Sequence, residues 1–196
     1  MIRLSERVLN NLEERRENIL NGNINCIPFP FPNFREDIPG IEQGRYISIT
    51  GATKSAKSQF ASELLFQALI YAYKHPEQLD ILIRYFPLEE TPERVMQRFM
   101  SYLLYDLTKG EVRISPRDLR SSVNSRPLPE EVLDLLRSEE FTNILDYFEE
   151  NIIFSTEINP TGIYKFCRNY AESHGTTYYK EIVIKDEFGV EKPIKV

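Results

Sequence analysis

The residue types best suited to chemistry lie in one octapeptide, Gly51-Ala52-Thr53-Lys54-Ser55-Ala56-Lys57-Ser58. A loop that binds phosphates needs backbone N–H groups turned inward, then a lysine and a hydroxyl residue that begin a helix. Lys57 would reach the β- and γ-phosphates of a nucleotide, and the Ser58 hydroxyl would hold Mg²⁺. The partial positive charge of the helix N-terminus would add to this attraction. The octapeptide therefore predicts a site for ATP and Mg²⁺, which we call the phosphate loop (residues 51–58).

The phosphate loop departs from the pattern G-x-x-x-x-G-K-[ST] at one position, where Ala56 replaces the second glycine. Glycine permits a positive φ and a close approach of the backbone to a ligand. If the site requires a positive φ, alanine costs about 1–2 kcal/mol there. The rest of the loop and Lys57 would still bind phosphate. The alternative interpretation is an ordinary turn between a strand and a helix.

A pair of carboxylates, Glu89 and Glu90, follows the apolar run 81–86. Ligands of open parallel sheets bind at the carboxyl ends of the strands. Either glutamate could therefore polarise the water that attacks a γ-phosphate. The alternative is that both are acids that favour the first turn of a helix beginning at Pro92.

Cysteine and histidine offer little chemistry here. Cys26 and Cys167 lie far apart, and neither has a second cysteine or a histidine at ligand spacing. A structural zinc site needs about four ligands, so we expect two reduced thiols and no zinc. His75 and His174 stand beside expected helix ends, where a terminal or surface role is expected.

The first 39 residues predict an amphipathic helix and a tether. Apolar residues recur at helical spacing over residues 3–20, and Asn21-Gly22-Asn23 ends the pattern. Four prolines between Cys26 and Pro39 indicate an extended segment. The helix could pack on a neighbouring subunit, as in a homo-oligomer, or fold back on its own domain.

From Arg45 the pattern changes to alternating strands and helices. We expect strands at 45–50 and 81–86 and helices at 59–73 and 92–105, the second capped by Thr91. This order is typical of an α/β fold with a parallel sheet and flanking helices.

The remainder is more helical. Helix starts are expected at 115–118 and 128–131, the latter helix continuing to about Phe148. A third short strand is expected at 151–155, a helix at 159–172, and a β-hairpin in the tail.

Several segments resemble DnaB-type replicative helicases. The run 88–98 is similar to the family's SLEM-x-x-E-x-x-x-R segment. Residues 14–22 and 27–31 resemble its linker helix and IPTGF motif, and 40–46 its GGLQPGEL approach to the first strand. The runs 114–120 and 159–175 follow in the expected order.

The resemblance implies a hexameric, ATP-driven DNA helicase core with a RecA-like phosphate-loop fold. It assigns Glu89 as the catalytic glutamate and matches Lys57 and Ser58 to the phosphate-binding lysine and the Mg²⁺ ligand. Arg98 matches an arginine in the helix after the glutamate. With the octapeptide, Gln59 and Arg98 complete the set of nucleotide-binding candidates.

Later parts of that family's core are missing from this sequence: a strand ending in a Mg²⁺-binding Asp, the loops that bind single-stranded DNA, and the arginine finger. We therefore expect a linker and tether at 1–39 and a partial RecA-like ATPase domain at 40–196, either a fragment or a naturally short relative. Alternatives are another RecA-like ATPase, or a nucleotide-binding or subunit-interaction module that lacks hydrolysis.

Composition sets broad limits on function. The net charge of −6 argues against a chain that coats nucleic acid by electrostatics alone. No stretch approaches the roughly 18 consecutive apolar residues of a membrane span, and residues 1–7 lack a signal-peptide core. We expect a cytoplasmic protein with no membrane partner.

Overall fold

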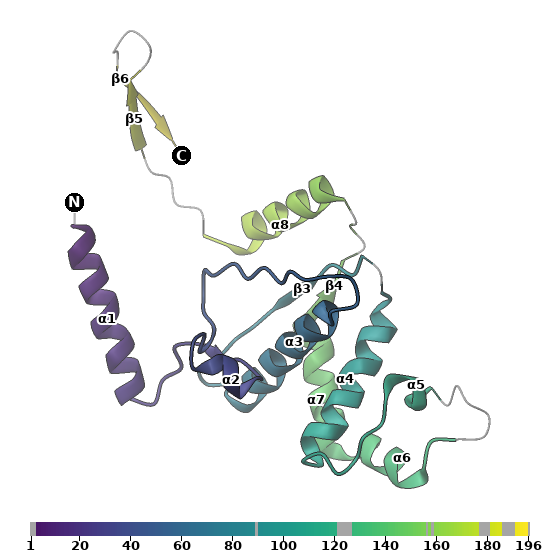
Figure 1. Ribbon diagram of the computed structural model, residues 1–196. Coiled ribbons are helices and arrows are strands. Elements are labelled where there is room, and N and C mark those ends of the chain that lie inside the picture. The colour runs from purple at the N-terminus through teal and green to yellow at the C-terminus, as the bar shows by residue number, and fades with distance from the viewer. Residues whose placement is uncertain are drawn as a thin grey trace. The chain divides into compact units, whose positions relative to one another are not determined.

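The structure is a computed structural model that describes residues 3–88, 90–120, 127–155, 157, 159–176, 181–185 and 191–195 (Figure 1). The chain divides into two compact units, Met1–Phe154 and Ser155–Val196.

The N-terminal segment contains one long helix and a short strand pair. Helix α1 spans Leu4–Leu20, as predicted, and buries none of its residues. Strands β1 (Ile27–Pro28) and β2 (Gly40–Ile41) pair antiparallel on either side of helix α2 (Pro32–Arg35). A Cβ on Gly40 would lie 2.0 Å from the Ile27 carbonyl oxygen, so only glycine allows this pairing.

Three helices of the first unit enclose its core (Figure 1). They are α3 (Lys57–Lys74), α4 (Pro92–Leu107) and α7 (Glu139–Asn151). Short helices α5 (Pro116–Leu119) and α6 (Glu130–Leu136) join α4 to α7. The core consists of buried apolar side chains from these helices and one strand: Phe66, Leu69, Ile70, Val95, Phe99, Leu103, Leu104, Val132, Phe141, Ile144, Phe148 and Ile152.

The helix boundaries follow local signals. Pro92 occupies the first turn of α4, where its missing N–H costs nothing. The predicted single helix from 128 to 148 is wrong, because Ser138 begins a new helix there. Its hydroxyl accepts the N–H of Phe141, and α6 ends at Leu136 with Arg137 as its C-cap.

The sheet is much smaller than predicted. Strand β3 (Ile83–Tyr85) pairs in parallel with β4 (Ile152–Phe154), and each has three residues. The described strands form only two-stranded sheets. The prediction of a RecA-like α/β fold, with a parallel sheet and flanking helices, is therefore wrong, and the first unit is mainly helical.

The expected strand at 45–50 accounts for much of this difference. These residues form no strand in the described chain, and Tyr46 is 92% exposed. The β-branched residues Ile47, Ile49 and Thr50 favour an extended backbone. A parallel strand also needs neighbours that cover its edges and faces. Here helices α3, α4 and α7 bury their apolar surface against one another instead.

The second unit holds a helix and a hairpin. Helix α8 (Pro160–His174) begins at Asn159, whose side chain accepts the N–H of Gly162 at 2.7 Å. Strands β5 (Glu181–Lys185) and β6 (Glu191–Lys195) pair antiparallel, which confirms the predicted hairpin. Among all the described helices, none combines the length and apolar character needed to cross a bilayer.

Candidate functional site

The phosphate loop closes on itself just before α3. The Ser55 N–H donates to the Ala52 carbonyl at 3.2 Å, which forms a tight turn. A Cβ on Gly51 would lie 2.6 Å from the Ser55 hydroxyl oxygen, a distance that side chains do not adopt. Any larger residue at position 51 would therefore force the Ser55 hydroxyl to rotate away from the loop.

Ala56 adopts the left-handed conformation that the phosphate-loop pattern assigns to glycine. Its φ is 59° and its ψ is 23°, and it occupies the position just before the first residue of α3. Lys54 also has a positive φ, of 65°. A non-glycine residue in this region costs about 1–2 kcal/mol. Ala56 thus adopts the positive φ that the sequence pattern reserves for glycine at this position.

The Lys57 ammonium group lies over the loop. Its Nζ donates to the carbonyl oxygens of Gly51 at 2.9 Å and Ala52 at 2.8 Å. These neutral acceptors hold the side chain folded back from the helix without neutralising its charge. An anion in the concave side of the loop would therefore meet a positioned cation.

The first turn of α3 adds further donors. The Phe60 N–H is bonded to the Ala56 carbonyl at 2.9 Å, and no side chain of the described residues caps the turn before it. The N–H groups that precede Phe60 in this turn have no intrahelical acceptor, and the dipole of this 18-residue helix favours negative charge here. The Phe31 ring stacks on Phe60 at 4.7 Å and so packs the chain before the loop against the helix start.

Ser58 is exposed in the same turn. Nucleotide-bound Mg²⁺ commonly takes one or two protein oxygens and completes its shell with phosphates and water. A single accessible hydroxyl therefore fits the predicted metal role. The described residues contain no group of three or more His, Cys, Asp or Glu side chains that could hold a metal ion by themselves.

Gln59 and Arg98 lie on one pocket of about 630 Å³ between α3 and α4. The Gln59 amide donates to Glu63 at 3.1 Å within α3. Tyr102 also lines this pocket, and its burial, with the nearby Asp106 and Glu63, raises its pKa to about 12. The tyrosine thus keeps its proton, and the structure brings two of the predicted binding residues to one surface.

Arg98 forms an ion pair with Glu90. The arginine side chain is 17% exposed and that of Glu90 is 29% exposed. No hydrogen bond joins Arg98 to the phosphate loop in the described chain. The predicted catalytic residue, Glu89, lies outside the described residues, so its role stays a prediction.

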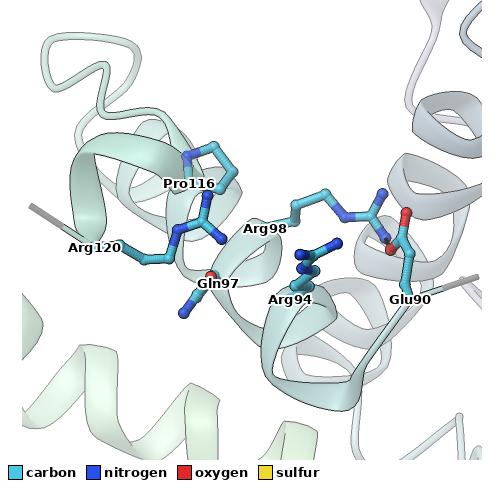
Figure 2. Close-up of a pocket in the computed structure, with 6 residues that line it drawn as sticks. All are labelled: Glu90, Arg94, Gln97, Arg98, Pro116 and Arg120. Atoms are coloured by element: carbon cyan, nitrogen blue, oxygen red, sulfur yellow. Dashed lines mark hydrogen bonds and ion pairs between the residues drawn. The ribbon is translucent and has the colours of Figure 1, made fainter. Parts of the chain in front are cut away.

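A second pocket gathers residues that the sequence reasoning missed. Arg94, Gln97 and Arg120 line it together with Glu90, Arg98 and Pro116, around about 350 Å³ (Figure 2). Arg94 and Arg98 are four residues apart and share a face of α4. That spacing was visible in the sequence. The approach of Arg120, at the end of α5, depends on the tertiary fold.

The two cysteines and two histidines belong to no metal-binding group among the described residues. Cys26 and Cys167 are free thiols, and burial, followed by the charge of Glu42, raises the pKa of Cys26. The His75 ring is hydrogen-bonded to the Tyr71 carbonyl, and the His174 ring to the Tyr170 carbonyl, each one helical turn earlier. These contacts agree with the expected helix-terminal roles of the two histidines.

The chain matches no family model, curated protein or solved structure in comparisons with all three. The resemblance to DnaB-type helicases therefore stays a prediction from sequence segments.

The left-handed backbone at Ala56 predicts a stabilising substitution. Ala56→Gly removes the steric cost of the positive φ, so we expect the free energy of unfolding to rise by about 1 kcal/mol. Urea denaturation measures this change. Ala61→Gly, at an exposed interior position of the same helix, should lower the free energy by about 1 kcal/mol. Equal losses in both variants would contradict the left-handed assignment.

Proposed function

We propose that this chain is a nucleotide-binding module whose phosphate loop binds the phosphates of ATP with Mg²⁺. The observation that carries this proposal is the Lys57 ammonium, held over the loop by the Gly51 and Ala52 carbonyls. Two further features lie beside this ammonium group: Ala56 is left-handed, and no side chain caps the start of α3. Together these features present a cation and several N–H donors to one anion.

The loop is also open to a ligand. Residues 51–56 and Ser58 are exposed, so phosphates can approach without displacing core side chains. Lys57 is partly buried and therefore loses less side-chain freedom on binding than an extended surface lysine would. A preorganised cation of this kind favours polyphosphates over a nucleoside that lacks them.

Binding is better supported than hydrolysis. In a parallel sheet, a catalytic glutamate is aligned with the phosphate loop because both follow neighbouring strands. The residues before this loop form no strand beside β3 in the described chain. The RecA-like ATPase alternatives lose their structural basis with that sheet. ATP hydrolysis by Glu89 and a role with single-stranded DNA stay predictions of the resemblance.

The first test concerns Lys57. In Lys57→Ala the ammonium that faces the phosphates is lost, so we expect ATP affinity to fall at least tenfold, as loss of about 1.5–3 kcal/mol implies. Isothermal titration calorimetry with ATP, ADP and adenosine measures this. The parent chain should bind ATP and ADP more tightly than adenosine.

Lys74→Ala is the matched control, because Lys74 belongs to the last turn of the same helix and forms an exposed ion pair with Asp106 at 3.5 Å. It removes the same charge and should leave ATP affinity unchanged. Equal ATP affinity of Lys57→Ala and the parent chain would refute the site.

The second test concerns Mg²⁺. Ser58→Ala should abolish the increase in ATP affinity that Mg²⁺ produces, and leave Mg²⁺-free binding close to that of the parent. Ser5→Ala is the control, since Ser5 holds the same second position in exposed helix α1 that Ser58 holds in α3. An undiminished Mg²⁺ effect in Ser58→Ala would remove this serine from the metal site.

We further propose that α1 mediates homo-oligomer formation. The helix buries none of its residues, although Leu4, Val8 and Leu12 share one face and are 68%, 50% and 58% exposed. An apolar stripe of this kind gains free energy when a second copy covers it. Of the two alternatives left open by the sequence, the exposure favours packing on a neighbour.

The test compares two faces of α1. The double variant Val8→Ser, Leu12→Ser should shift the chain toward the monomer in sedimentation velocity runs over a range of concentrations. The double variant Asn10→Ser, Glu14→Gln changes the opposite face and should sediment like the parent chain. A parent chain that is monomeric at the highest concentration would contradict the proposal.

A further inference from the structure

The pocket between α4 and α5 concentrates positive charge in a chain whose net charge is −6. Arg94 and Arg98 reach it from successive turns of α4, and Arg120 reaches it from the end of α5 (Figure 2). Glu90 is the one carboxylate among the described lining residues. The lining therefore carries two positive charges in excess.

Two of the three arginines have no acidic partner among the described residues. Within the described chain, neither Arg94 nor Arg120 lies within ion-pair distance of a carboxylate, and both are exposed. Arginines of like charge that converge on one pocket repel each other unless an anion or solvent lies between them. The arrangement thus favours an anionic ligand over an empty pocket.

Arg98 has one buried nitrogen without a hydrogen-bond partner among the described residues. One of its terminal nitrogens is bound to Glu90, whereas its Nε is buried and has no hydrogen-bond partner within the described chain. A buried donor without an acceptor costs about 1–3 kcal/mol. Because this Nε is shielded from solvent, Arg98 would offer its terminal nitrogens, and not its Nε, to a ligand in the pocket.

We propose that this pocket binds a phosphate monoester or free phosphate, as a site separate from the phosphate loop. At neutral pH such a group carries about −1.5 to −2 charges and three strong acceptor oxygens. This charge matches the excess of the lining. Planar guanidinium groups bind phosphate oxygens in pairs, so three arginines can satisfy one phosphate group.

The shape favours one terminal phosphate over a nucleic-acid backbone. A backbone tracks along a basic groove over several nucleotides. Here the three arginines line one pocket of about 350 Å³, and Arg98 is turned toward Glu90 (Figure 2). Acidic side chains, Glu93 and Asp118, lie next to it in sequence on the same two helices. These acids would repel neighbouring phosphates of a strand.

The experiment observes the arginine side chains directly. The ¹⁵N-labelled full chain is titrated with inorganic phosphate, at ionic strength held constant with chloride, and the arginine Nε–Hε resonances are followed by NMR. We expect saturable shifts in Arg94, Arg98 and Arg120. Arg120→Gln should weaken phosphate binding at least tenfold. Arg117→Gln, an exposed arginine within α5, should bind like the parent.

Further arms separate the two sites and test whether a phosphate monoester occupies the same pocket as free phosphate. Lys57→Ala should retain the phosphate-induced shifts, and Arg120→Gln should retain ATP binding at the phosphate loop, so either proposal can fail alone. Ribose 5-phosphate is expected to compete with inorganic phosphate.

Three results would overturn the proposal: unchanged phosphate affinity in Arg120→Gln, equal weakening in Arg117→Gln, or shifts produced only by a single-stranded oligonucleotide that lacks terminal phosphates. The last result would instead identify a surface for nucleic acid. Circular dichroism of each variant checks that the exposed substitutions leave the helices intact.

Discussion

The arrangement of both candidate sites depends on the packing of one buried phenylalanine. Phe99 of α4 lies between Phe148 of α7, at 4.3 Å between ring centroids, and Phe66 of α3, at 5.2 Å. All three side chains are at most 1% exposed. Burial of aromatic side chains supplies a large share of core energy, and their offset or tilted contacts fix relative orientation. This cluster therefore sets where α3 and α4 lie.

The packing of α3 against α4 also positions the candidate sites, because their residues lie near the starts of these two helices. The phosphate loop leads into α3, nine residues before Phe66, whereas Arg98 directly precedes Phe99 in α4. A rigid core can hold exposed polar groups in place because each is only a turn or two from a buried anchor. Pro116 and Arg98 line both pockets beside α4, and Gln59, the residue after the phosphate loop, lines the larger one.

The sequence predicted features that depend on local chemistry. The Asn159 cap, the Pro92 helix start and the turn before α3 each follow from a few neighbouring residues. The expected strand at 45–50 failed because its residue types specify an extended backbone but not a pairing partner. A sheet requires contacts between distant segments, and residues 45–50 stay largely exposed because the helices form the core without them. For the same reason, the approach of Arg120 to α4 was not predictable.

The phosphate loop shows how a mismatch to a pattern can still preserve a geometry. Ala56 is left-handed although its side chain disfavours that conformation. Neighbouring interactions over-determine it: Phe60 donates to its carbonyl, and the Lys57 ammonium bonds to carbonyls of residues 51 and 52. Residues in disfavoured backbone regions persist where the surroundings fix them, and such residues gather at ligand sites. Lys109 is also left-handed and lies at no proposed site, so the support for a binding role comes from the combination of Ala56 with the Lys57 ammonium and the uncapped start of α3.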